Sequence, residues 1–64
     1  MSFAEELKKA RAEAGITQTQ MFELIGVPRR TVQDWERGLK EPPSYVQRLL
    51  LKELENIKKE NPLH

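Results

Sequence analysis

The segment between the second and third glycines carries side chains that suit hydrogen bonding to an external partner. On a helix, at roughly 100° per residue, four of them share an arc of about 100° and a fifth lies just outside it. The four are Arg30, Gln33, Asp34 and Arg37, and the fifth is Arg29. Arginine matches O6 and N7 of guanine, glutamine can pair with N6 and N7 of adenine, and aspartate can accept from N4 of cytosine. The arc therefore has the chemistry to contact base edges, although a merely solvated helix face has the same pattern.

Catalytic chemistry has little support in this chain. There is no cysteine, and the one histidine, His64, is the last residue. We find no glycine-rich phosphate loop and no pair of carboxylates beside a nucleophile, and a domain of 64 residues is too small for a deep pocket. The sequence predicts a protein that is not an enzyme and has no cofactor, metal site or small-molecule substrate.

The overall charge is nearly balanced, with 11 basic and 10 acidic side chains and a net charge of +1. Attraction to a nucleic acid must therefore depend on local placement. Residues 29–40 contain four basic and two acidic side chains, so this segment carries a local excess of positive charge. The longest apolar run is the three leucines 49–51, so we expect no membrane contact and a cytoplasmic location.

Two short helices are predicted in the first half of the chain. The first begins with Ser2 as N-cap, has Glu5 in the capping-box position, and ends at Gly15. The second begins at Thr17, with Gln20 in the capping-box position, and ends at Gly26. These signals place a tight turn before the polar segment.

Two further helices are predicted in the second half. Pro28 begins the third, which continues to about Arg37 and is ended by Gly38. The fourth extends from Ser44 to about Lys59, because its apolar residues keep a helical spacing.

These elements predict an all-α fold. No segment alternates apolar and polar residues as a strand would, so we expect a small bundle of four short helices, or at most five. Residues 1–60 form one domain in this interpretation, and residues 61–64 form a frayed tail.

The segment RAEAGITQTQMFELIGVPRRTVQDWERGLKEP, residues 11–42, resembles the helix-turn-helix of the phage repressor and Cro family, also called the xenobiotic-response-element-like family of bacterial regulators. The matching positions include Arg11, Gly15, Thr17, Gln18, the turn segment 24–27, Val32, Trp35, Glu36, Gly38 and Pro42. The resemblance implies a lambda-repressor-like fold, with the helix-turn-helix at about residues 17–37. It also implies sequence-specific binding of double-stranded DNA by a transcriptional regulator, with repression as the expected effect.

The resemblance also assigns roles to individual residues. Gln18 would contact a phosphate at the start of the second helix, where free amides favour an anion. The third helix would be the recognition helix in the major groove, with base contacts from Arg29, Arg30, Gln33 and Asp34. Arg37 and Lys40 would lie near phosphate oxygens and supply sequence-independent affinity.

Glu36 is predicted to have a structural role. The rotation count places it on the core side of its helix, where an unpaired carboxylate is costly. Proteins that resemble this one pair it with an arginine at the position of Arg11. We therefore expect an Arg11–Glu36 salt bridge between the first and third helices.

A homodimer on DNA is expected, because one such unit contacts only a few base pairs. Leu50, Leu54 and Ile57 form a stripe on the last helix and are the candidates for the dimer contact. The alternative is a monomer whose last helix closes the bundle.

Two points stay open at the level of sequence. Phe22 stands where the family usually has alanine, so its ring either widens the crossing of the second and third helices or turns into solvent.

The alternative function is a small helical protein-interaction module, or an antitoxin-like adaptor, that no longer binds DNA.

Overall fold

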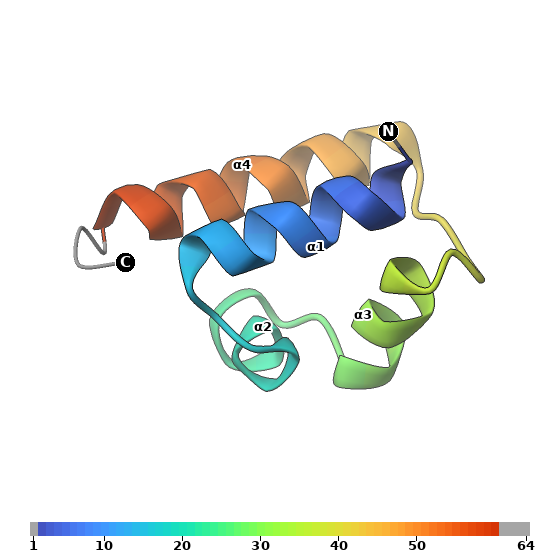
Figure 1. Ribbon diagram of the computed structural model, residues 1–64, viewed down its shortest axis with the longest axis horizontal. Coiled ribbons are helices and arrows are strands. Elements are labelled where there is room, and N and C mark those ends of the chain that lie inside the picture. Colours follow the sequence, from blue (N-terminus) through green and yellow to red (C-terminus); the bar gives the residue numbers. More distant parts are fainter. Residues whose placement is uncertain (1, 61–64) are drawn as a thin grey trace.

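The computed structural model describes residues 2–60, and these fold into four α-helices (Figure 1). The helices are α1 (Phe3–Ala14), α2 (Gln18–Ile25), α3 (Arg29–Glu36) and α4 (Ser44–Glu60). Helices α1 and α4 lie side by side and run in the same direction, and α2 and α3 lie together beneath them (Figure 1). The predicted all-α fold with four helices is confirmed.

The helix boundaries follow the capping signals of the sequence. The Ser2 hydroxyl accepts a hydrogen bond from the backbone N–H of Glu5 at 3.3 Å, and this begins α1. The capping box predicted at Thr17 forms in both directions: its hydroxyl accepts from Gln20 N–H at 3.1 Å, and its own N–H donates to Gln20 Oε1 at 2.8 Å. Each cap satisfies backbone donors that a helix start leaves free.

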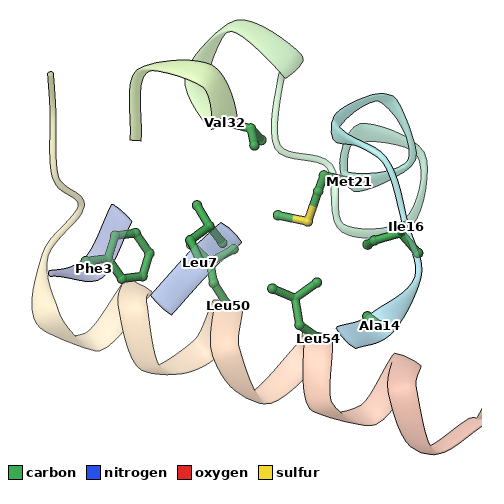
Figure 2. Close-up of a cluster of buried hydrophobic side chains, with 8 residues drawn as sticks. All are labelled: Phe3, Leu7, Ala14, Ile16, Met21, Val32, Leu50 and Leu54. Carbon is green, nitrogen blue, oxygen red and sulfur yellow. The ribbon is translucent and has the colours of Figure 1, made fainter. Parts of the chain in front are cut away.

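The core lies between the two layers and receives side chains from all four helices (Figure 2). Its buried members are Phe3, Leu7, Ala14, Ile16, Met21, Val32, Leu50 and Leu54. Trp35 is half-buried and meets the Phe3 ring edge-on, with 6.3 Å between ring centroids and 69° between planes. This geometry suits the aromatic quadrupoles and helps to hold α3 against α1.

The structure corrects the predicted dimer stripe on α4. Leu50 and Leu54 are only 5% and 1% exposed, and both belong to the core of their own chain. Ile57 is half-buried and packs against that core. The stripe was identified correctly as one apolar face, but α1 and the helices below it cover that face. These leucines are therefore not available to a second subunit.

Phe22 turns into solvent, with 56% of its surface exposed. Its ring therefore does not lie between α2 and α3, which still pack directly on each other. Within the described residues no helix has the length and apolar character needed to cross a membrane. The predicted frayed tail, 61–64, lies outside the described residues.

Candidate nucleic-acid interface

The turn between α2 and α3 sets how α3 is presented. Gly26 has φ +88°, a left-handed conformation that favours glycine, and its N–H donates to Met21 O and Phe22 O at 3.2 and 3.0 Å. Pro28 precedes α3 without a side-chain cap, and its carbonyl accepts from Val32 N–H at 3.0 Å. Because Met21 and Val32 are both fully buried, the inner faces of α2 and α3 are fixed to the core. The opposite face of α3 points away from it.

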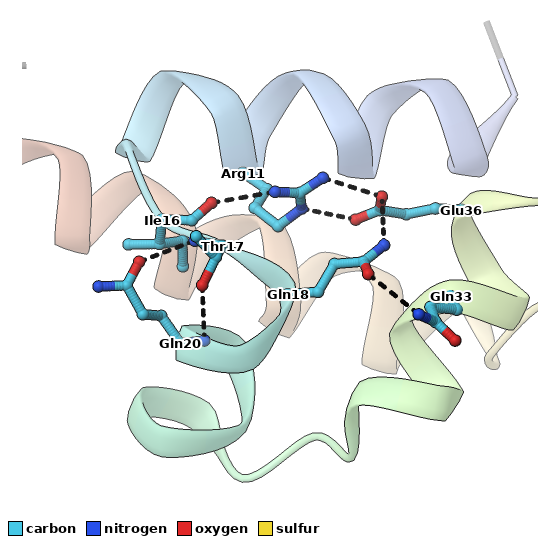
Figure 3. Close-up of polar contacts among 7 residues, drawn as sticks. All are labelled: Arg11, Ile16, Thr17, Gln18, Gln20, Gln33 and Glu36. Atoms are coloured by element: carbon cyan, nitrogen blue, oxygen red, sulfur yellow. Dashed lines mark hydrogen bonds and ion pairs between the residues drawn. The ribbon is translucent and has the colours of Figure 1, made fainter.

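The predicted salt bridge joins α1 to the last turn of α3 (Figure 3). Arg11 Nε and Nη2 donate to Glu36 Oε2 and Oε1 at 2.7 and 3.0 Å, so the pair is bidentate. Arg11 Nη1 also donates to the carbonyl of Ile16 at 3.0 Å, just before α2. Glu36 is only 7% exposed, and a buried carboxylate needs such partners. One arginine thus ties α3 to α1 and to the loop that leads into α2.

Two glutamines extend this network to the outer side of α3 (Figure 3). Gln18 Nε2 donates to Glu36 Oε1 at 3.2 Å, and Gln33 Nε2 donates to Gln18 Oε1 at a longer 3.4 Å. Both glutamines are half-buried. The sequence placed Gln33 on the polar arc, but its amide leans toward α2 instead of extending freely into solvent.

Four basic side chains lie at the two ends of α3 or in the loop that follows it. Arg29, Arg30, Arg37 and Lys40 are all exposed, and none of them forms an ion pair with another residue in the 2–60 range. Asp34 is half-buried beside them in sequence. Because Arg11 neutralises Glu36, this side of the molecule is more positive than the sequence tally indicates.

Lys8 is a member of this face that the sequence did not single out. It lines an open depression together with Gln18, Gln33, Glu36 and Arg37. Lys8 precedes Arg11 by three residues on α1, so the two share a helix face. That spacing was the available signal, since Lys8 and Arg11 leave α1 on a similar side and Arg11 was predicted to pair with Glu36.

The comparison with known families decides the identity of this arrangement. The family model described as helix-turn-helix matches residues 7–55, well over half of the chain. This protein belongs to the helix-turn-helix family. Neither a curated protein nor a solved structure gives a significant match.

This helix-turn-helix chain is of the type found in phage repressors and Cro proteins, as its motif indicated. The family is one of DNA-binding regulatory domains. In this chain α2 and α3 are the two helices of the motif, and Gly26 is the glycine of the turn between them.

The structure brings together only some of the predicted contact residues of this helix-turn-helix protein. Gln18, Gln33 and Arg37 line one depression. Arg29 and Arg30 occupy the first turn of α3, and Lys40 follows in the loop before α4. The predicted contact residues thus fall into a polar network near Glu36, a group of exposed cations at both ends of α3, and the half-buried Asp34 within that helix.

Proposed function

We propose that this protein binds double-stranded DNA sequence-specifically and represses transcription in a bacterium or its phage. The observation that carries the proposal is the exposed outer face of α3, which begins with Arg29 and Arg30. Arginine forks at the first turn of a helix suit guanine edges in a major groove. Such a protein would act in the cytoplasm, where that DNA is found.

Within this proposal the predicted residues divide into two groups. Base contacts would come from Arg29, Arg30, Gln33 and Asp34. Phosphate contacts would come from Gln18, Arg37 and Lys40. Gln18 can serve in this way because its amide nitrogen has two hydrogens and Glu36 occupies one of them. Occupation of promoter DNA is sufficient to exclude other proteins, so repression is the effect we propose.

A homodimer on DNA is part of the proposal. Its contact has to use side chains that the monomer leaves uncovered, which excludes Leu50 and Leu54. Tyr45 and Leu49 are 62% and 58% exposed and lie one helical turn apart on α4. We propose this pair as the centre of the contact between two copies.

Selection from a random duplex library tests DNA binding and symmetry together. The expected result is an enriched palindrome with half-sites about 34–36 Å apart, or 10 to 10.5 base pairs. Affinity for the enriched site should fall steeply with salt concentration. A library that shows no enrichment, with no salt-dependent binding to any duplex, would overturn the proposal.

The alternative is a helical module that binds another protein. Phe22 and Leu24 favour it, since both are more than half exposed on α2 and neither is among the proposed DNA contacts. The two functions differ in NMR titrations. Duplex DNA should shift the Arg29 and Arg30 signals if the protein binds DNA, whereas a partner protein should shift Phe22 and leave those arginines unchanged.

A further inference from the structure

A chain of hydrogen bonds connects the buried ion pair to the outer face of α3. It begins at Glu36, passes through Gln18 at 3.2 Å, and ends at Gln33 at 3.4 Å (Figure 3). Arg11 holds the Glu36 carboxylate from the opposite side with two hydrogen bonds. The chain thus joins a structural salt bridge to a proposed base-contacting residue.

Each member of this chain determines the orientation of the next. A carboxylate can only accept hydrogen bonds, so Gln18 must present its NH2 group to Glu36. Its Oε1 then points to the other side, where it accepts from Gln33 Nε2. A rotated Gln33 amide would place two carbonyl oxygens together. Rotating both amides would place Gln18 Oε1 against the carboxylate.

The fixed orientation leaves Gln33 with a defined set of free groups. Its Oε1 lies on the side away from Gln18 (Figure 3), and no residue within 2–60 donates a hydrogen bond to it. The second hydrogen on Nε2 is also free. Gln33 therefore offers one acceptor and one donor to an external partner, in an order that its own chain has set.

We propose that Glu36, through Gln18, presets Gln33 to recognise adenine and to reject guanine in the major groove. Adenine presents a donor at N6 and an acceptor at N7, which match Oε1 and the free N–H of Gln33. Guanine presents two acceptors, O6 and N7, so its O6 would face the Gln33 carbonyl. Glu36 and Gln18 are positioning residues in this scheme. The inference rests on the proposed function, which it makes more specific.

The direct variant, Glu36→Gln, also removes the buried ion pair and endangers the fold. Gln18→Met breaks the chain of hydrogen bonds at its middle and leaves the Arg11–Glu36 pair in place, so it is the variant to test.

The experiment begins with the duplex selected by the wild-type protein. The base pair at which Gln33→Ala loses its preference identifies the contact of Gln33. Affinities for adenine and guanine at that position are then compared.

The wild-type protein should prefer adenine to guanine by roughly 5- to 150-fold, the range of one good bidentate contact. Gln18→Met should reduce this ratio to about threefold or less, because the Gln33 amide can then rotate. Lys40→Ala is the control for the loss of a phosphate contact. It should lower both affinities by the same factor and keep the ratio.

A measurement without DNA tests the chain of hydrogen bonds alone. In the free protein, the side-chain NH2 signals of Gln33 should shift toward those of a solvated amide in Gln18→Met. Unchanged Gln33 signals would overturn the inference, whether or not the protein binds DNA. An adenine-to-guanine ratio that survives Gln18→Met would overturn it also, with the proposed function intact. Failure to bind any duplex would overturn the proposed function, and this inference with it.

Discussion

Arg11 and Glu36 are 25 residues apart in sequence, and their side chains form a bidentate pair with N–O distances of 2.7 and 3.0 Å. The Arg11 side chain is 22% exposed and that of Glu36 is 5% exposed, so water screens the pair only in part. The pair joins α1 to the last turn of α3, in addition to the Phe3–Trp35 ring contact between the same two helices. Its removal should therefore affect both stability and the placement of α3.

Arg11→Met should destabilise the protein by about 2–3 kcal/mol, because it leaves the Glu36 carboxylate buried without its cation. For a domain of this size the melting temperature should fall by roughly 10 °C or more. Thermal unfolding followed by circular dichroism measures this change. Lys58→Met is the control, since Lys58 pairs with Glu13 at 3.8 Å in an exposed position. It should change stability by less than about 0.5 kcal/mol. Equal effects of the two variants would contradict the assigned role of Arg11.

Leu54, one of the residues that the sequence assigned to a partner subunit, gives a second prediction. Leu54→Ala should cost about 2–5 kcal/mol of unfolding free energy, because the side chain is 1% exposed and its loss leaves a cavity. Leu49→Ala, on the same helix and 58% exposed, should stay within about 0.5 kcal/mol. Urea unfolding measures both variants. A Leu54→Ala protein that keeps its stability but loses self-association would restore the original assignment.

The sequence predicted the helices well because their ends depend on local chemistry. The Thr17–Gln20 capping box and the glycine that follows α2 act within a few residues, so their outcome is visible in the sequence. The Arg11–Glu36 pair was predicted from the family pattern, not from local rules. Helical spacing showed that Leu50 and Leu54 share a face, but it does not show which element covers that face.

The orientation of Gln33 could not be predicted in the same way. The rotation count gives the direction in which a side chain leaves its helix, and it placed Gln33 on the polar arc. Its amide bonds to Gln18, 15 residues earlier, and that contact depends on how α2 and α3 cross. The crossing is a product of core packing around Met21 and Val32, which no local pattern describes.

The turn before α3 gives a third prediction. Gly26→Ala should cost about 1–2 kcal/mol, because φ is +88° and an L-residue is strained there. The strain is in the backbone alone, since an added Cβ would meet no atom within 4 Å. Gly26→Asn should cost less, because asparagine tolerates this conformation better than alanine. Urea unfolding ranks the variants, and equal costs for alanine and asparagine would contradict this explanation.

Gly38→Ala serves as the comparison for Gly26→Ala. Gly38 also has a positive φ of +76° and open space around its Cβ position, so its substitution should cost a similar amount. A much larger cost at Gly26 would show that the turn between α2 and α3 needs more than its backbone conformation.

The last prediction separates base recognition from phosphate attraction on the proposed interface. Arg30→Ala should weaken binding to the selected duplex by about 1–3 kcal/mol and relax the preference at one base pair. Lys40→Ala should weaken binding to all duplexes alike and reduce the slope of log affinity against log salt by about 1. Both side chains are exposed and form no ion pair within residues 2–60, so neither variant should disturb the fold.

Lys52→Ala is the matched control, because Lys52 is an exposed lysine on α4, which the proposal does not place on DNA. It should leave both affinity and salt slope close to those of the wild type. Fluorescence anisotropy with the selected duplex and a scrambled duplex, at several salt concentrations, measures all three variants. If Lys40→Ala and Lys52→Ala had equal effects, the basic side chains around α3 would act only through net charge. If Arg30→Ala weakened both duplexes by one factor, Arg30 would contact phosphate and would not contribute to sequence recognition.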